Sequence, residues 1–510
     1  MNRKTIWVKI IFGLAVGLLT LFMRQSGYAQ KAPQEITILH TNDMHGAYLP
    51  SKATWEQGNP MVGGFEALSH YARTERQGLK RSLLFDCGDL MTGTLICDIP
   101  YEGAEGGALV AMMNRIGYDG WVFGNHEFDK PASNLRALIK IAKFPVFCAD
   151  LANDNKLFTS EPHHIYNLDG LRVGVIGLTY HQMLGMASGK NLEGYRSVDP
   201  VEAVKKEVAE IDSLTDLIIV LSHLGIENDS VLAANTHGVD LILGGHSHTR
   251  LESPWKVNGV QIAQTGSNCR NLGRIDLTVV GDSIMAINGK LIAMYTKDIK
   301  PDTVISQMVS RFKAEIDSQY AIVIAELKVP TESNYRAESN IGNWLTDVLR
   351  NRMNTEIGIL NSGGIRKNLS PGPVTKMDIL EMLPFDNQVV TFTCTGADLQ
   401  KLAEANIGSE QGGSHGSLQL SGLTYKWKLE NSKPKVVEIR VNNKKIKKSK
   451  IYTVSSIDYI ASSNAMRYMG FEPKDIKADY YLKLSDLIMQ EAEKVMVIEP
   501  KVEGRIKKIE

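Results

Sequence analysis

The sequence has few cysteines and almost no histidine in its second half. Its 510 residues include five cysteines, at positions 87, 97, 148, 269 and 394. These are too few and too scattered for a disulfide framework, so we expect buried free thiols, with a Cys87–Cys97 pair as the alternative. Eleven of the twelve histidines lie before Arg250. Metal or acid–base chemistry is therefore expected in the first half of the chain.

The sequence also lacks an excess of charge of one sign. The 57 Lys and Arg residues balance 57 Asp and Glu residues. Four of the basic residues and none of the acidic ones lie in the first 29 positions, so the rest of the chain is slightly acidic. This composition argues against nucleic acid as a partner. The length exceeds that of one ordinary core, so two domains are expected.

Only the N-terminus carries a long apolar run. Basic residues at positions 3, 4 and 9 precede the apolar run at 10–23, and Gly27-Tyr28-Ala29 offers the small residues that signal peptidases read. We predict that residues 1–29 are a cleaved signal peptide, which makes the protein periplasmic or secreted, with no stable membrane span after cleavage. The run is short for a membrane span, which favours a signal peptide. An uncleaved anchor starting at Ile6 is the alternative. No cysteine follows the run, which argues against a lipid anchor.

Polar side chains follow five predicted strands, at the point where each strand ends. The strands lie at 35–41, 82–89, 120–123, 216–222 and 240–243, and the polar residues at their ends are Asp43, His45, Asp89, Asn125, His126, His223, His246 and His248. Helical patterns at 63–77, 110–116, 201–214 and 231–236 separate the strands, which predicts an α/β sandwich. Because ligands gather at the carboxyl ends of strands in such folds, we expect these side chains to meet.

Two Asp, one Asn and four His among these residues form a suitable ligand set for two adjacent metal ions. Asp89 would have to bridge the two ions. Oxygen and imidazole ligands without cysteine favour Zn, Mn, Fe, Co or Mg over a thiolate site. Taken alone, the segment Asn42-Asp43-Met44-His45-Gly46 also fits an ordinary turn, since Asn-Asp and His-Gly are turn formers.

A second pattern begins at about residue 329. Before it, an amphipathic helix at 302–320 is predicted to connect two domains. After it, Ser339 and Asn340 can cap a helix, and a strand at 357–360 leads into Asn361-Ser362-Gly363-Gly364-Ile365-Arg366. We predict a first domain at 30–300, a linker at 301–328 and a smaller α+β domain at 329–510. The lysine-rich segment at 443–448 is predicted to be a solvated hairpin tip, with an anion-binding patch as the alternative.

These motifs resemble those of the calcineurin-like metallophosphoesterases, in the 5′-nucleotidase branch. The matching segments, in order, are Asp43-x-His45, Gly88-Asp89, Gly124-Asn125-His126-Glu127, His223 and Gly245-His246-x-His248. The resemblance implies a four-layer αββα sandwich followed by a C-terminal substrate-binding domain. It also implies two divalent metal ions, Zn, Mn or similar.

The resemblance implies a role for each matching residue. Asp43, His45, Asp89 and His248 would hold one metal, and Asp89, Asn125, His223 and His246 the other. His126 with Asp129 would form a catalytic dyad. In the second domain the resemblance implies nucleotide contacts from Asn361, Arg366, Phe385, Tyr459 and Arg336. The loop at 462–466 departs from the family pattern because it lacks an acidic residue, and Asn464 is the neutral acceptor available there.

The function that the resemblance implies is hydrolysis of nucleoside 5′-monophosphates to nucleoside and phosphate. The partner would be a small-molecule nucleotide, and the oligomeric state is not predicted. Alternatives on the same fold are hydrolysis of UDP-sugars, of 2′,3′-cyclic nucleotides or of sulfur esters, and a non-catalytic nucleotide-binding protein. The segment at 361–366 and Phe385 favour a nucleotide over a sulfur ester. The complete ligand set argues against loss of catalysis.

Overall fold

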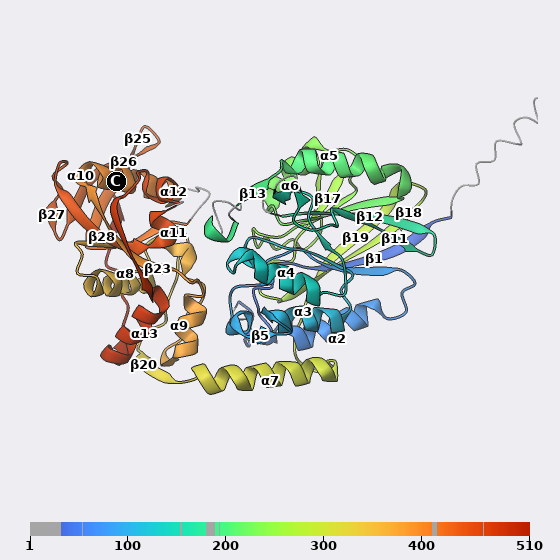
Figure 1. Cartoon of the computed structure of the whole chain (residues 1–510), viewed down its shortest axis with the longest axis horizontal. Coiled ribbons are helices and arrows are strands. Elements are labelled where there is room, and N and C mark those ends of the chain that lie inside the picture. The colour runs from blue at the N-terminus through green and yellow to red at the C-terminus, as the bar shows by residue number, and fades with distance from the viewer. Residues whose placement is uncertain are drawn as a thin grey trace, which may run out of the picture.

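The computed structural model describes residues 32–509, except 54, 154–155, 180–188, 193, 411–415 and 463. The predicted signal peptide at 1–29 lies outside the described residues. Two units lie side by side, and helix α7 (Thr303–Tyr320) with strand β20 (Val323–Leu327) leads from one to the other (Figure 1). Within the described ranges, no helix combines the length and apolarity that a membrane span requires.

Two six-stranded sheets form the first unit. The first has the order β19 (Ile284–Ala293), β18 (Asn271–Val279), β1 (Gln34–Thr41), β4 (Ser82–Asp86), β7 (Gly120–Val122) and β8 (Val146–Phe147). The second has the order β11 (His163–Leu168), β12 (Leu171–Leu178), β14 (Leu217–Ser222), β15 (Leu241–Leu243), β17 (Val260–Ala263) and β16 (Trp255–Val257). Strands β1, β4, β7 and β8 run parallel, and so do β12, β14, β15 and β17. Their carboxyl ends therefore share one edge in each sheet.

Helices cover the outer face of each sheet. Those of the first unit are α2 (Phe65–Arg76), α3 (Gly107–Ile116), α4 (Ala132–Ile141), α5 (Pro200–Ile211) and α6 (Ile226–Asn235). In β1, Ile38 packs between the sheets while its neighbour Leu39 packs among α2, α3 and α7. In β12, Val175 packs between the sheets while Ile176 packs against α5. This alternation produces the predicted αββα sandwich.

Short elements lie in the loops of the first unit. The short strands are β2 (Ser51–Lys52), β3 (Met61–Val62), β5 (Pro100–Tyr101), β6 (Ala104–Glu105), β9 (Leu151–Asn153), β10 (Lys156–Leu157) and β13 (Tyr195–Ser197). The predicted helix at 231–236 was placed too late, because α6 begins directly after Gly225, which has a φ of 87°. Glu227 and Asp229 in its first turn favour this start electrostatically. All five cysteines are buried and free, as predicted.

The second unit has its own core around three sheets. The five-stranded sheet has the order β24 (Leu418–Ser421), β21 (Ile357–Asn361), β28 (Ile451–Ile457), β23 (Gln388–Thr395) and β29 (Lys474–Lys483). The others are β27 (Lys444–Lys445), β26 (Lys433–Val441), β25 (Leu423–Glu430) and β31 (Ile506–Lys508), and β22 (Gly372–Thr375), β20 and β30 (Val497–Ile498). The helices are α8 (Asn340–Arg352), α9 (Lys376–Met382), α10 (Gly396–Glu410), α11 (Asp458–Ala461), α12 (Ala465–Met469) and α13 (Leu484–Val495).

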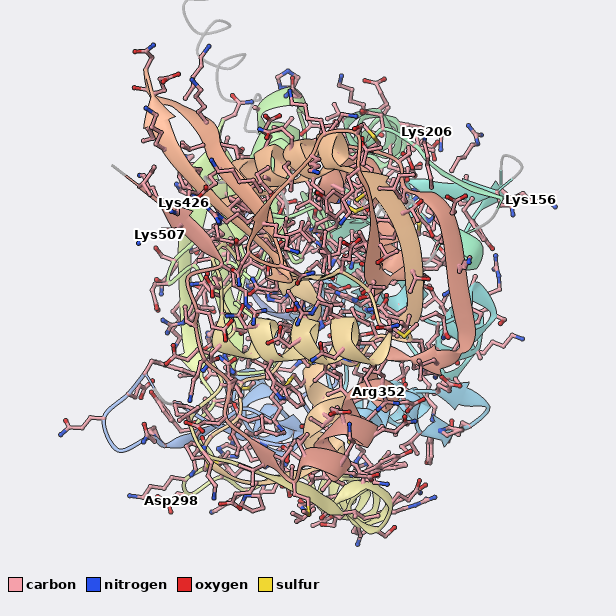
Figure 2. All side chains as sticks on the ribbon, turned by 90° about the vertical axis from the view of Figure 1, so that its left-hand side faces the viewer. Lys156, Lys206, Asp298, Arg352, Lys426 and Lys507 are labelled. Carbon is pink, nitrogen blue, oxygen red and sulfur yellow. The ribbon has the colours of Figure 1, made fainter. Side chains whose placement is uncertain are left out.

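Three predictions for the linker and the second half of the chain are confirmed locally. The Ser339 hydroxyl accepts the Gly342 N–H and caps α8, as predicted. Lys444 and Lys445 are exposed on β27, as predicted for a solvated hairpin tip. Strand β26 separates them from β25 and β31, whose exposed cross-strand pair Lys426 and Lys507 is labelled in Figure 2. Helix α7 buries its predicted apolar stripe, including Phe312, in the core of the first unit. The domain boundaries at 30–300, 301–328 and 329–510 stay a prediction.

Candidate metal centre

The carboxyl ends of five strands meet at one edge of the first unit. Loops after β1, β4 and β7 come from the first sheet, and loops after β14 and β15 come from the second. These loops carry all the predicted metal ligands, which the structure brings together: Asp43, His45, Asp89, Asn125, His223, His246 and His248. The ligand atoms fall into two neighbouring groups.

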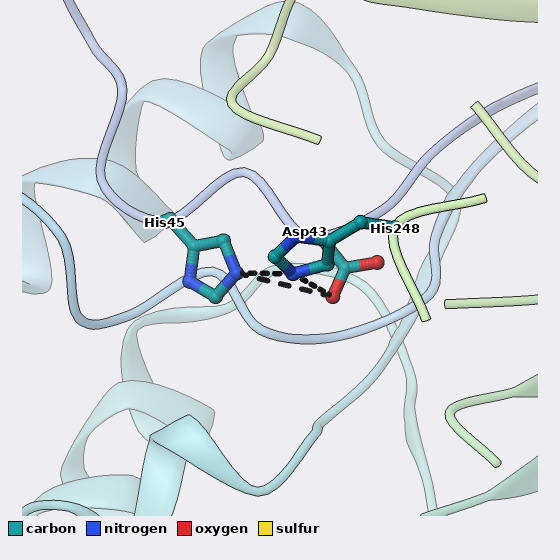
Figure 3. A group of neighbouring side chains, drawn as sticks. All are labelled: Asp43, His45 and His248. Atoms are coloured by element: carbon teal, nitrogen blue, oxygen red, sulfur yellow. Dashed lines mark hydrogen bonds and ion pairs between the residues drawn. The ribbon is translucent and has the colours of Figure 1, made fainter. Parts of the chain in front are cut away.

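The first group is Asp43, His45 and His248, whose ligand atoms all lie within 4.8 Å of one another (Figure 3). His45 Nε2 lies 2.9 Å from His248 Nε2, which in turn lies 3.4 Å from Asp43 Oδ1. His45 donates its Nδ1–H to the Thr92 carbonyl at 2.9 Å, so its Nε2 carries a lone pair. A lone pair that faces another imidazole nitrogen and a carboxylate requires a cation or a shared proton.

The second group is Asp89, His223 and His246. His223 is fully buried and donates its Nδ1–H to the Cys87 carbonyl at 2.6 Å, while its Nε2 lies 3.1 Å from Asp89 Oδ2. Burial lowers the pKa of His223, but the charges of Asp89 and Asp43 outweigh this and raise the pKa to about 10. The group therefore attracts positive charge, and its donor atoms fit a divalent cation.

His246 links the two groups. Its backbone N–H donates to both carboxylate oxygens of Asp43, at 3.1 and 2.9 Å. Its Nδ1 lies 2.8 Å from Asn125 Oδ1, which adds a neutral oxygen beside the second group. His246 and His248 thus lie in different groups, although they are two residues apart in the chain.

Several of these residues have strained backbones. Asp43, His45, Asp89, His246 and His248 have φ angles of 49°, 49°, 55°, 73° and 52°. Positive φ is uncommon for residues other than glycine and costs free energy. Such strain is typical of functional sites, where the surrounding fold holds side chains in a required geometry.

His126 lies at the side of this cluster. Its Nδ1 lies 2.6 Å from Asp129 Oδ2, and its Nε2 lies 4.0 Å from Asp89 Oδ2. Burial lowers the pKa of His126, but the charges of Asp129 and Asp89 outweigh it, so the pKa is raised above its usual value. A histidine held by a carboxylate beside a candidate metal centre is suited to proton transfer.

Comparison with known proteins accounts for both units. The family model described as calcineurin-like phosphoesterase matches residues 36–250, and the model described as 5′-nucleotidase, C-terminal domain, matches residues 323–471. The chain belongs to the 5′-nucleotidase family of calcineurin-like phosphoesterases. The predicted family and fold are therefore confirmed.

Relatives of this 5′-nucleotidase family member occur among bacterial proteins. It is 25% identical to the trifunctional nucleotide phosphoesterase protein YfkN of Bacillus subtilis, over 93% of this chain and 35% of that protein. It is 28% identical to a 5′-nucleotidase of Vibrio cholerae, over 72% of this chain and 74% of that protein. The chain spans only 35% and 38% of the length of the two Bacillus subtilis proteins YfkN and endonuclease YhcR. A 5′-nucleotidase precursor structure from Thermus thermophilus aligns with a TM-score of 0.83, at 26% identity, over 93% of this chain and 99% of that one.

The second unit places Phe385 and Arg366 beside the centre. The Phe385 ring centroid lies 5.7 Å from that of His126, and Arg366 Cζ lies 5.9 Å from the same Phe385 centroid. After burial and His248, the charge of Arg366 adds to the lowering of the pKa of His45. The nucleotidase-type C-terminal unit therefore reaches the ligand groups across the domain boundary.

The other predicted substrate residues are placed unequally. Asn361 and Phe385 line the same small cavity. Tyr459 packs its ring 6.1 Å from Tyr468, and the Asn464 amide donates to the Tyr459 carbonyl at 3.1 Å. Arg336 is exposed, and no hydrogen bond or ring contact joins it to the other predicted substrate residues within the described ranges.

Tyr335, which was not predicted from the sequence, is an aromatic residue beside the loop at 361–366. Its backbone carbonyl accepts the Ser362 hydroxyl at 2.7 Å, and its ring lies next to Gly363. Its side chain is 53% exposed, so the ring remains accessible to a ligand. The available sequence signal for Tyr335 was an aromatic residue one position before Arg336.

Glu127 belongs to the Gly124-Asn125-His126-Glu127 motif, and the sequence alone predicts no role for it. Its buried carboxylate accepts the backbone N–H groups of Asp89, Met91 and Gly124 at 3.2, 3.0 and 2.6 Å. Burial and the charge of Asp89 raise the pKa of Glu127 to about 7. One side chain thus ties the loop after β4 to the loop after β7.

Another group of possible ligands lies elsewhere, at His163, Glu207 and Glu210. Lys206 Nζ already lies 2.7 Å from Glu207 Oε1 and 3.5 Å from Glu210 Oε1. The ammonium group supplies the positive charge there, at the surface position labelled in Figure 2.

Replacing Gly124 by alanine is expected to disrupt the centre. A Cβ atom at Gly124 would lie 2.3 Å from Asp89 Oδ1 and 2.5 Å from His223 Nε2, so both ligands would have to move. We expect a loss of metal affinity of at least about tenfold, the lower range for disturbed ligand support. Metal analysis after dialysis measures this. Gly408→Ala is the matched control, because nothing lies within 4 Å of that Cβ. Equal metal content in the two variants would contradict the placement of these ligands.

Proposed function

We propose that the protein is a metal-dependent phosphoester hydrolase that converts nucleoside 5′-monophosphates to nucleoside and phosphate. The observation that carries this proposal is the position of Phe385, whose ring lies 5.7 Å from the His126 ring beside the two ligand groups. An aromatic ring suited to stacking on a base is thus close to groups suited to holding a phosphate. The names of the relatives from Bacillus subtilis and Vibrio cholerae support a nucleotide substrate.

The two ligand groups are proposed to hold two divalent cations, Zn, Mn or similar. Asp43, His45 and His248 would hold one, His223 and His246 the other, with Asn125 and the shared Asp89 completing the set. Such cations, when bound, polarise the phosphoryl group and lower the pKa of a bound water to about 7. The Nε2 lone pair of His45 and the buried Nε2 of His223, 3.1 Å from Asp89 Oδ2, are the features of this chain that support the assignment.

His126 is proposed to hold and deliver the proton. Its Nδ1–H donates to Asp129 Oδ2 at 2.6 Å, so its Nε2 is left to face the reacting groups. The hydrogen bond to the Asp129 carboxylate stabilises the protonated ring. Its Nε2–H can then protonate the leaving ester oxygen of the nucleoside.

The second unit is proposed to bind the nucleoside and to select it. Arg366 is exposed beside Phe385 and can pair with phosphate oxygens in a fork. Asn361 offers a buried side-chain oxygen at the same cavity. We also propose Tyr459 and Arg336 as contacts to the substrate. We further propose that the protein is periplasmic or secreted after cleavage of the signal peptide at residue 29.

A substrate panel tests the proposed function. With Mn²⁺ or Zn²⁺, the purified protein is expected to release phosphate from AMP, and EDTA is expected to abolish this release. Phosphate release from aryl phosphates but from no nucleotide would refute the nucleotide assignment and spare the metal centre. The sulfate thiohydrolase SoxB of Thermus thermophilus is similar in fold at 16% identity. This similarity concerns the fold alone and carries no argument about the substrate.

Replacing Phe385 by alanine is expected to raise KM for AMP roughly tenfold, because stacking on a base is worth about 1–3 kcal/mol. The KM for a simple alkyl phosphate should stay unchanged, because such a substrate has no base. Steady-state kinetics on both substrates measure the split. Trp255→Ala, at an exposed tryptophan of the second sheet, is the control. An equal rise in both KM values would show that Phe385 acts only through packing.

A further inference from the structure

We propose that Thr92 is a positioning residue that fixes the His126–Asp129 pair and the His45 ligand in a single geometry. The proposal rests on the proposed function, since it assigns a residue to the same reaction. Thr92 follows β4 in the loop that carries Asp89, and its side chain is almost fully buried. Its two polar groups contact two different parts of the centre.

The hydroxyl of Thr92 orients the carboxylate of Asp129. Thr92 Oγ1 donates to Asp129 Oδ2 at 2.7 Å. The same oxygen accepts the Nδ1–H of His126 at 2.6 Å. With both bonds on one oxygen, rotation of the carboxylate would break both, so the hydroxyl selects the carboxylate orientation that holds His126.

The backbone carbonyl of Thr92 orients His45. It accepts the Nδ1–H of His45 at 2.9 Å, and the Met91 carbonyl adds a longer contact at 3.2 Å. This fixes the tautomer that turns the Nε2 lone pair toward Asp43 and His248. One residue therefore supports a proposed metal ligand with its backbone and the proposed proton donor with its side chain.

The backbone of Thr92 carries strain that glycine would remove. Its φ angle is 64°, which is a genuine outlier for a β-branched residue. Glycine populates this region at no steric penalty, but it has no hydroxyl. Holding threonine here is therefore explained by the hydrogen bond to Asp129, in keeping with strain at functional sites.

The expected consequence is a defect that depends on the leaving group. A misoriented His126 matters most when the leaving oxygen needs a proton, as for the alkoxide of AMP. It matters little for p-nitrophenyl phosphate, whose leaving phenolate is stable. A merely structural role for Thr92 would lower both rates alike.

The test compares Thr92→Val, Thr92→Ser and a matched control. Thr92→Val keeps the shape and loses the hydroxyl, and we expect kcat for AMP to fall roughly tenfold, typical of a lost hydrogen bond to a charged group. The rate with p-nitrophenyl phosphate should stay within about twofold, metal content should be retained, and Thr92→Ser should restore the AMP rate. Thr94→Val is the control, since Thr94 Oγ1 donates to the Gly46 carbonyl at 2.6 Å in the same loop and lacks the bond to Asp129.

A spectroscopic measurement separates this inference from the proposed function. The proton between His126 Nδ1 and Asp129 Oδ2, which are 2.6 Å apart, is expected to give a low-field NMR resonance. This resonance should shift in Thr92→Val and return in Thr92→Ser. Equal loss of both activities, failure of Thr92→Ser to restore the AMP rate, or an unmoved resonance would overturn the inference. If the unaltered protein hydrolyses no nucleotide, the proposed function fails, and the resonance still decides the role of Thr92.

Discussion

Replacing Asp89 by asparagine is expected to abolish activity by losing metal from both ligand groups. Asp89 Oδ2 lies 3.1 Å from His223 Nε2, and its Oδ1 accepts the backbone N–H of His126 at 2.9 Å. The ligand atoms of Asp89, His45 and His126 also lie within 4.8 Å of one another, so Asp89 adjoins the first group as well. Loss of a residue that only hydrogen-bonds to a ligand weakens metal binding about 10–100-fold. Loss of this shared ligand charge should therefore lower activity by more than about 100-fold.

Metal analysis and steady-state kinetics on the same Asp89→Asn preparation measure this effect. Asp169→Asn is the matched control, because Asp169 also has a positive φ, 49°, but is exposed at a turn far along the chain. The control should keep both metal and activity. A fully metallated and active Asp89→Asn variant would remove Asp89 from the proposed centre.

Replacing His126 by alanine is expected to lower kcat roughly 100-fold or more, the usual contribution of a general acid. Metal content should be retained, because the other histidines of the two groups keep their own partners. The fall should be larger for AMP than for p-nitrophenyl phosphate, since only the former needs a protonated leaving oxygen. Rate measurements with both substrates, beside metal analysis, provide the comparison.

An exposed histidine serves as the control for His126→Ala. His237 lies on the surface after α6, so His237→Ala should leave kcat unchanged. An unchanged kcat in His126→Ala would exclude the histidine and Asp129 from the mechanism. A loss of metal in His126→Ala would instead make His126 a ligand.

The strand ends could be predicted because buried parallel strands are readable as short apolar runs. Strands such as β12 and β14 are buried along almost their whole length, and polar residues begin where they end. Parallel order then places those residues at one edge. His223 and the paired histidines at 246 and 248 could therefore be predicted from the sequence to lie at this edge.

The supporting contacts could not be predicted because they depend on backbone conformation. Thr92 and Glu127 act on groups whose positions follow from left-handed residues such as Asp89, and sequence rarely reveals positive φ outside glycine. The local backbone conformation likewise decides that Tyr335, rather than Arg336, lies beside the loop at 361–366. Contacts between the two units, such as Phe385 with His126, depend on how separate cores dock.

The two sheets of the first unit contribute ligands to a single seam. Loops from one sheet carry Asp43 and Asp89, and loops from the other carry His223 and His246. Metal binding is therefore also folding free energy for the contact between the sheets. The metal available to the protein should then govern how long it survives proteolysis, as well as its catalytic rate. The second unit, which has a separate core, should depend less on metal for its stability.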